Sequence, residues 1–312
     1  MLTLLVAGLL LAGLYLYGAR GARRVEVVHP PLGSFVEVEG VRLHFLEKGK
    51  GTPVVLVHGA SITLLDWTAS IFDDLAKNHR VLAFDRPGYG HSERPNGEWP
   101  SPAVQARLIH GALATLGVER PVLVAHSWAG SLALAFALAY PNDLKGMVLL
   151  SPASHPWPGG VAAYRRLACA PLAGPLFLRL LLYPLGRFAV ARGVEGTFRP
   201  SAPPEGYREQ AGIDLLLRPS QFRADAEDVS RLKDFLALQH PRYPKIRVPL
   251  TIMTGEPDRI VSSRTHARAL HAQLPHSRLV VLGDIGHLPH HSRRDNVLAE
   301  IFALTGARAA ER

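Results

Sequence analysis

Three side chains that lie far apart in the sequence, Ser127, Asp258 and His287, have the types that nucleophilic catalysis requires. A serine hydroxyl becomes a good nucleophile only when a positioned base removes its proton. A histidine can be that base, and a carboxylate bonded to its other ring nitrogen holds the ring in the correct tautomer. If the fold brings the three together, we expect Ser127 to attack a carbonyl carbon and form an acyl-enzyme.

The serine lies in the segment LVAHSWAGS, residues 123–131, where an apolar strand pattern changes into a helix pattern. A nucleophile at such a tight turn is held in a strained conformation, with its oxygen exposed above the sheet. Helix and strand backbones crowd there, so the positions two before and two after the serine require small residues. Ala125 and Ala129 occupy them, where the usual pattern has glycine. Taken alone, the segment also fits an ordinary serine that caps a helix.

The base and the acid follow two later strand patterns. His287 comes after the pattern of residues 277–283, and Asp258 comes after that of residues 248–253. Ligands of parallel sheets bind beyond the carboxyl ends of the strands. We therefore expect the acid and the base to meet the serine at that edge. Glu256 is the alternative acid.

The elements that must position these residues follow from hydrophobic periodicity. Short, continuously apolar runs are typical of strands buried on both faces. They alternate with longer helical patterns, which predicts an α/β fold with a doubly wound, mostly parallel sheet preceded by a hairpin over residues 35–51. The predicted strands are 53–57, 80–84, 121–125, 144–150, 248–255 and 277–283, and the predicted helices are 66–76, 101–116, 127–139, 262–273 and 289–304.

Residues 152–245 interrupt this alternation. They are rich in proline, glycine, arginine and leucine, with short helical patterns and no clear strand. We interpret them as a helical cap inserted into one catalytic domain, whose halves are residues 35–151 and 246–312. The apolar stretch Pro171 to Val190 is expected to form the core of a lid over the site, and lid contact with a bilayer is the sharper hypothesis.

Five ordered motifs lie in residues 35–150 and 246–305. They are Val57-His58-Gly59-Ala60, the run Asp85 to Ser92, the turn around Ser127, the Gly255 to Asp258 turn, and Gly286-His287. Together they resemble the α/β-hydrolase superfamily. Within it, the chain is most similar to the branch of esterases, meta-cleavage-product hydrolases and epoxide hydrolases. Epoxide hydrolases and haloalkane dehalogenases of this fold use aspartate as nucleophile, so Ser127 argues against both activities.

This resemblance implies an α/β-hydrolase fold with a mostly parallel eight-stranded sheet, helices on both faces and a helical cap. It makes Ser127, Asp258 and His287 the catalytic triad and the backbone N–H groups of Ala60 and Trp128 the oxyanion hole. The expected substrate pocket includes Ser61, Trp128 and Leu288. We expect no cofactor.

Several other polar residues receive structural interpretations. The chain has fifteen histidines, but no HExxH or other metal-ligand spacing, so we expect no metal site. His290 and His291 are interpreted as helix-surface or site-wall residues. Asp85 is expected to fix its loop, and His58 to support its loop by hydrogen bonding. Trp128 either lines the acyl pocket or packs in the core.

The first 18 residues form an apolar segment that predicts an anchor helix or a signal sequence. Residues 19–34 are expected to be a tether. Arg20, Arg23 and Arg24 favour an uncleaved anchor with the catalytic domain on the cytoplasmic face. The alternative is a secreted or periplasmic protein after signal cleavage.

The net charge of +9 comes from arginines scattered through the chain. Because they form no basic stripe, we do not expect nucleic-acid binding. One cysteine, Cys169, excludes an intrachain disulfide. The oligomeric state stays open.

These features together predict a membrane-anchored serine hydrolase that cleaves hydrophobic carboxylic esters. Two alternatives remain. A C–C bond hydrolase of meta-cleavage products would use the same triad and would need an arginine for its acidic substrate, with Arg165, Arg166 and Arg187 as candidates. A hydrolase-like binding protein would need no triad.

Overall fold

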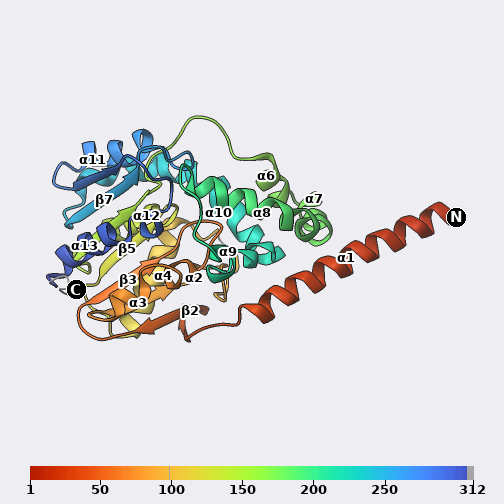
Figure 1. Cartoon of the computed structure of the whole chain (residues 1–312), viewed down its shortest axis with the longest axis horizontal. Helices are drawn as coiled ribbons and strands as arrows, with labels where there is room; N and C mark the ends of the chain where they lie inside the picture. The colour runs from red at the N-terminus through yellow and green to blue at the C-terminus, as the bar shows by residue number, and fades with distance from the viewer. Residues whose placement is uncertain (98, 308–312) are drawn as a thin grey trace.

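The computed structural model describes residues 1–97 and 99–307 and is built around one eight-stranded sheet (Figure 1). The strand order is β1-β2-β4-β3-β5-β6-β7-β8. β1 pairs antiparallel with β2, and β2 with β4, while all later pairs are parallel. The strands are β1 Ser34–Val38, β2 Val41–Lys48, β3 Pro53–Val57, β4 Arg80–Phe84, β5 Val122–His126, β6 Gly146–Leu150, β7 Leu250–Gly255 and β8 Arg278–Leu282.

Helices cover both faces of the sheet, as the strand patterns require. In β3, Val55 and Val57 face one apolar core, and Val54 and Leu56 face the other, because successive strand residues point to opposite faces. The first core includes α4 Pro102–Thr115, α5 Ala129–Ala139 and α11 Ala269–Gln273. The second includes α2 Leu65–Thr68, α3 Phe72–Ala76 and α13 Arg294–Thr305. The predicted fold class is confirmed.

Three predicted helices are divided. Residues 66–76 form α2 and α3, and residues 262–273 form the π-helical turn Arg264–Arg268 followed by α11. Residues 289–304 form α12 Pro289–Ser292 and α13, separated at Arg293, whose φ of −139° leaves the helical region. Hydrophobic periodicity cannot reveal such breaks, because the spacing of apolar residues in the sequence continues across them.

Residues 152–245 are helical, and none of them forms a strand. Their own apolar core includes Leu178, Leu182, Phe198, Tyr207 and Phe222. The helices are α6 Ala163–Cys169, α7 Ala173–Leu176, the π-helical turn Phe177–Leu181, α8 Leu182–Phe198, α9 Tyr207–Gln210, the 3-10 turn Ile213–Leu217, α10 Pro219–Gln239 and the 3-10 turn His240–Lys245.

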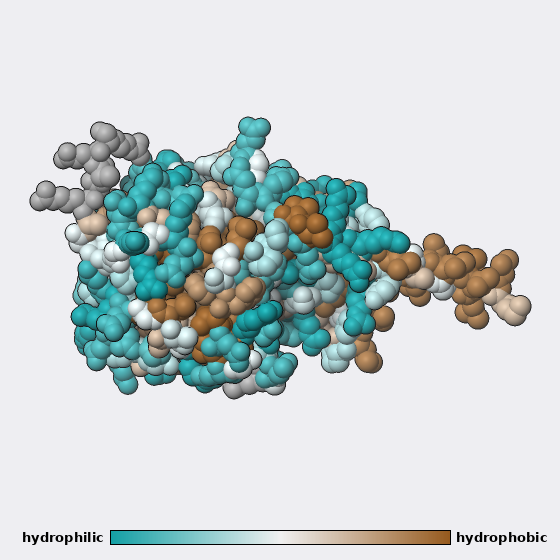
Figure 2. Space-filling view, turned by 90° about the horizontal axis from the view of Figure 1, so that it is seen from below, coloured by the Kyte–Doolittle hydropathy of each residue, from teal (hydrophilic) through white to brown (hydrophobic). Residues whose placement is uncertain are grey.

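The N-terminal helix is longer than predicted. α1 runs from Leu2 to Val28, so most of the expected tether is helical, and it ends just before the Pro30-Pro31 pair. Its first part projects away from the body (Figure 1) and presents apolar side chains (Figure 2). By length and composition, α1 and the continuous helical stretch Ala173–Phe198 could each cross a membrane.

The second half of α1 packs against the cap. Gly18, Gly21 and Val25 are buried there. A Cβ at Gly18 would lie 2.9 Å from the carbonyl oxygen of Arg179, and one at Gly21 would overlap the ring of Tyr183. The two glycines therefore let α1 approach the cap closely. Residues 19–24 are rich in arginine and were interpreted as part of a tether, so this interface was not predicted.

Candidate active site

Ser127 lies at the turn between the central strand β5 and helix α5, with a φ of +53°. Such a conformation is uncommon outside glycine. The close approach of backbones explains the small residues around it: Ala125 and Ala129 are fully buried, and a Cβ on Gly130 would lie 2.5 Å from Cβ of Pro152. Alanine is thus accommodated where glycine is usual.

The structure brings the three predicted catalytic side chains together. Nε2 of His287 lies 2.9 Å from Oγ of Ser127, and Nδ1 of His287 lies 2.7 Å from Oδ2 of Asp258. With Nδ1–H donating to the carboxylate, Nε2 is free to accept the serine proton. His287 follows β8, and its backbone N–H donates to the carbonyl of Thr197 at the end of α8, 3.0 Å away.

Asp258 is held as a carboxylate. Burial opposes its ionisation, but His287 and the backbone N–H groups of Ile260 and Val261 outweigh burial and hold the pKa of Asp258 below its usual value. The alternative acid, Glu256, instead pairs with Arg268 at 2.7 Å.

The residues of the two predicted oxyanion donors, Ala60 and Trp128, line the same cavity as Ser127. In the part of the chain that the structure describes, the backbone N–H groups of Ala60 and Trp128 donate to no other protein atom. The loop of Ala60 approaches the serine closely, because a Cβ on Gly59 would lie 2.9 Å from Cβ of Ser127. These groups are available to a developing negative charge.

A family model described as the Alpha/beta hydrolase family matches residues 54–300. The chain belongs to the alpha/beta hydrolase family. The match includes the triad positions, the oxyanion loop and the whole cap.

Curated relatives of this alpha/beta hydrolase include proteins with and without a described activity. An uncharacterized protein of Mycobacterium tuberculosis is 29% identical over 288 residues, which cover 87% of this chain and 80% of that protein. The 2-hydroxy-6-oxo-6-phenylhexa-2,4-dienoate hydrolase of Comamonas testosteroni is 27% identical, over 81% of this chain and 87% of its own length.

Solved structures share the fold at lower identity. An alpha/beta hydrolase fold protein from Burkholderia ambifaria superposes with a TM-score of 0.72 at 22% identity, covering 87% of this chain and 98% of that one. A thermophilic esterase from Thermogutta terrifontis superposes with a TM-score of 0.66 at 24% identity, covering 86% of this chain and 96% of that one.

The triad of this alpha/beta hydrolase opens into a cavity of about 1010 Å³ between the sheet and the cap. Its walls are mainly aliphatic and aromatic, with α8 contributing a large share. The expected pocket residues Ser61, Trp128 and Leu288 all line it. Trp128 also packs in the core: Arg86 lies 4.0 Å above its ring, and its Nε1–H donates to the carbonyl of Asp228. Both interpretations of Trp128 therefore apply.

Two charged residues of the cavity wall, Asp225 and Arg259, were not predicted. Asp225, on the cap helix α10, accepts hydrogen bonds from the backbone N–H of Ser61 at 2.6 Å and from its hydroxyl at 3.1 Å. Arg165 of α6 lies 3.0 Å from the other carboxylate oxygen. Ser61, whose φ is +66°, is thus held in place by the cap. The sequence separation of 164 residues leaves no local signal of this contact.

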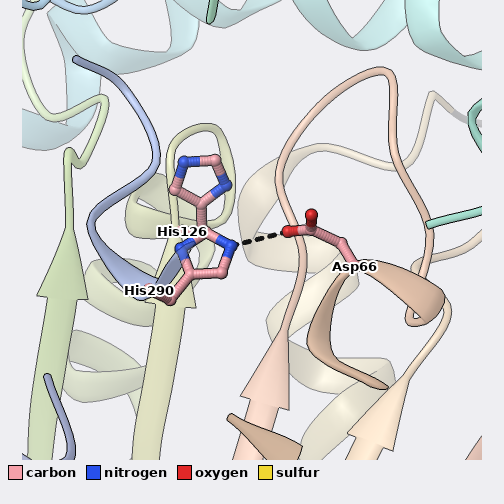
Figure 3. Close-up of side chains that lie close together, drawn as sticks. All are labelled: Asp66, His126 and His290. Atoms are coloured by element: carbon pink, nitrogen blue, oxygen red, sulfur yellow. Dashed lines mark hydrogen bonds and ion pairs between the residues drawn. The ribbon is translucent and has the colours of Figure 1, made fainter. Parts of the chain in front are cut away.

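Asp66, His126 and His290 form a buried cluster (Figure 3), and the ring centroids of His126 and His287 lie 4.8 Å apart. Nε2 of His290 lies 2.7 Å from Asp66, and Nε2 of His126 lies 2.9 Å from the carbonyl oxygen of His287. The three candidate ligand atoms lie within 4.8 Å of one another. The hydrogen bonds of the cluster connect α12 with α2, and the end of β5 with the backbone of His287.

Both oxygens of Asp66 are occupied. Nε2 of His291 lies 2.9 Å from Asp66, and the hydroxyl of Tyr207, from the cap, donates to the same oxygen at 2.8 Å. The interpretation of His290 and His291 as helix-surface or site-wall residues was wrong: His290 is fully buried and bonded to α2. The break at Arg293 allows this short helix to be oriented independently of α13. Burial opposes ionisation of Asp66, but the two histidines outweigh burial and hold its pKa well below the usual value.

The two supporting roles expected near the site agree with the hydrogen bonds. Asp85 accepts from the backbone N–H groups of Leu64 and His91, at 2.9 and 3.0 Å, and so fixes two loops. His58 accepts from the backbone N–H of Arg86 at 2.9 Å, and burial lowers its pKa to about 4, which keeps the ring neutral.

Proposed function

We propose that this alpha/beta hydrolase is a membrane-anchored serine hydrolase that cleaves hydrophobic carboxylic esters. The observation that carries the proposal is the hydrogen-bonded series Ser127–His287–Asp258 at the base of a large, mainly apolar cavity. Apolar walls with a few polar groups at one point bind an uncharged substrate and orient its reacting bond.

In the proposed mechanism, Oγ of Ser127 attacks the ester carbonyl carbon while its proton passes to Nε2 of His287. The N–H groups of Ala60 and Trp128 stabilise the tetrahedral oxyanion. The C–O bond then breaks, and the protonated His287 gives its proton to the leaving alcohol. A water molecule, deprotonated by His287, then attacks the acyl carbon; the bond from that carbon to Oγ breaks, and His287 returns the proton to Ser127 as the acid leaves.

The anchor part of the proposal rests on α1. A signal sequence that is cleaved off needs no packing contact with the mature protein. In α1, by contrast, Gly18, Gly21 and Val25 are buried against the cap. The 18-residue apolar window of α1 contains no buried residue, so its projecting part needs another apolar environment. An uncleaved helix that enters a bilayer accounts for both observations.

C–C bond hydrolysis is the second candidate, because relatives such as the Comamonas testosteroni enzyme are named for dienoate substrates. An acidic dienoate would need an unpaired cation in the cavity. One arginine of the cavity wall, Arg165, is paired with Asp225, whereas the exposed Arg259 of the same wall has no ion pair within the part of the chain that the structure describes. Arg259 is therefore available to an acidic group, and the dienoate remains the competing substrate.

The proposal is tested first with a fluorophosphonate label. We expect the wild-type protein to be labelled, Ser127→Ala to lose labelling completely, and Cys169→Ser to retain it as a control. The binding-protein alternative gains if the wild type does not react.

A panel of p-nitrophenyl esters and a dienoate then separates the two activities. We expect turnover of the esters to rise with acyl length until the cavity is filled, and little turnover of the dienoate. The reverse preference would assign the protein to C–C bond hydrolysis.

A further inference from the structure

Exposed apolar side chains of the body are concentrated on one part of the cap. Outside α1, seven of the eleven exposed large apolar residues among those described come from residues 164–188. Leu172 is 85% exposed and Phe188 is 67% exposed. We call this group the cap patch; its members are Tyr164, Leu167, Leu172, Leu176, Leu181, Leu185 and Phe188. Exposed apolar side chains that gather on one part of a protein mark an interaction site.

The cap patch adjoins the point where α1 leaves the body. The base of α1 packs on the π-helical turn Phe177–Leu181 and on α8, the elements that carry much of the patch. Tyr17 contacts Tyr183 edge to face, with ring centroids 5.6 Å apart, and accepts a hydrogen bond from Arg187. In Figure 2, apolar atoms on the body adjoin the projecting apolar helix. Insertion of α1 therefore brings this end of the cap to the membrane surface.

The catalytic cavity opens at the same place. Leu181, Leu185, Ala189 and Gly193 lie four residues apart along the cap helix, and each is both exposed and part of the cavity wall. Tyr164 meets both conditions on α6. The part of the rim that the cap forms is thus apolar, whereas Arg259 and Ser262, which follow β7, are exposed polar residues of the same cavity wall.

Charge at the patch fits an anionic lipid surface. Arg20, Arg23 and Arg24 are exposed on the segment of α1 that reaches the body, and Arg187 lies at the contact between α1 and α8. Each basic residue near an anionic bilayer contributes about 1 kcal/mol of attraction.

We propose that the cap patch docks on the bilayer that α1 enters, so that the cavity mouth opens onto lipid and receives membrane-dissolved esters. This inference rests on the proposed function for its substrate and on α1 for its orientation. A lipophilic ester is concentrated in the bilayer, and direct entry avoids its transfer through water.

The first experiment compares two triple variants of the full-length protein in vesicles of phosphatidylcholine and phosphatidylglycerol. L172Q/L176Q/F188Q changes three patch residues that do not line the cavity, and L32Q/F35Q/L238Q changes three exposed apolar residues outside the patch. The readout is the rate on a vesicle-borne long-chain ester divided by the rate on a water-soluble short-chain ester. We expect this ratio to fall about tenfold or more in the patch variant, because apolar contact with lipid is lost, and to stay unchanged in the control.

The second experiment measures contact directly and needs no turnover. A fluorophore on F188C, in a C169S background, is expected to be quenched by spin labels in the acyl chains, and the same fluorophore on L238C is not. An unquenched label at residue 188, or an unchanged ester ratio in the patch variant, overturns the docking. If the wild type cleaves neither ester, the proposed function fails, while the quenching still decides whether the patch meets lipid.

Discussion

Ser127 has a backbone conformation that its neighbours enforce by hydrogen bonds. Its N–H donates to the carbonyl of Leu150, and its carbonyl accepts from the N–H groups of Gly130 and Ala153, each at 2.9 Å. Strain of this kind costs about 1–3 kcal/mol and persists only where the surroundings fix it. The hydroxyl is therefore aimed at the cavity before any substrate arrives.

Gly59 provides a test of this geometry at the scale of one methyl group. A Cβ there would lie 2.9 Å from Cβ of Ser127 and 3.0 Å from Nδ1 of His126, neither of which can move freely. We expect Gly59→Ala to displace the Ala60 N–H and lower kcat about 10²-fold, the cost of a lost oxyanion donor, with a small change in Tm.

The matched control is Gly160→Ala, since no atom lies within 4 Å of a Cβ at that position. Steady-state kinetics on a short p-nitrophenyl ester and thermal unfolding of both variants provide the measurements. An unaltered kcat in Gly59→Ala would show that the loop can shift without moving the donor.

The meeting of Ser127, Asp258 and His287 could be predicted from sequence because each follows a recognisable strand, and their order matched a known arrangement. The residues that hold the site in place could not be predicted. Asp66 bonds His290 across 224 positions, and Asp225 bonds Ser61 across 164, with no pattern around either carboxylate. Such pairs depend on how the cap and the first half of the core are placed in space.

At the scale of elements, Asp225 connects a cap helix to the oxyanion loop and to Arg165. We expect Asp225→Asn to lower the free energy of unfolding by about 3 kcal/mol, because the buried guanidinium loses its partner. Adding Arg165→Met should restore most of that loss, since no unpaired charge remains. Chemical denaturation of the two variants measures both effects.

The activity of the same pair of variants separates positioning from stability. If Asp225 positions the Ser61 segment, kcat stays low in the stable double variant while KM changes little. Full recovery of kcat together with stability would assign Asp225 a purely structural role.

Helix α1 and the cap form the other contact between elements that sequence did not reveal. A side chain at Gly21 would overlap the ring of Tyr183, so Gly21→Leu is expected to separate α1 from α8. In detergent, trypsin should then cleave faster after Arg20, Arg23 or Arg24. Gly13→Leu is the control, because nothing lies within 4 Å of that position. Equal cleavage of the two variants would contradict a packed interface.

At the scale of the whole molecule, buried neutral histidines determine how stability depends on pH. Burial, with nearby positive groups, lowers the pKa of His58, His155 and His266 to about 4 each. The unfolded chain binds these protons near pH 6.5. Between about pH 6.5 and 4 the unfolded state therefore holds more protons, and stability falls as the pH is lowered through that window.

We expect Tm in a neutral detergent to fall steadily from about pH 6.5 to about pH 4. His155→Gln should reduce the slope, because the unfolded state then gains one proton fewer. His276→Gln, at an exposed position, should leave it unchanged. A Tm that stays constant over the window would contradict the assignment of neutral, buried rings.

Helix α8 makes one further connection. It contacts α1 at Tyr17, and at its other end the carbonyl of Thr197 accepts the backbone N–H of His287. A bilayer that is thicker or thinner than the apolar length of a helix changes the tilt of that helix. If α1 enters a bilayer as proposed, such a tilt acts on a helix that also holds the backbone of His287. Bilayer thickness and tension are then expected to affect the catalytic rate, alongside substrate concentration.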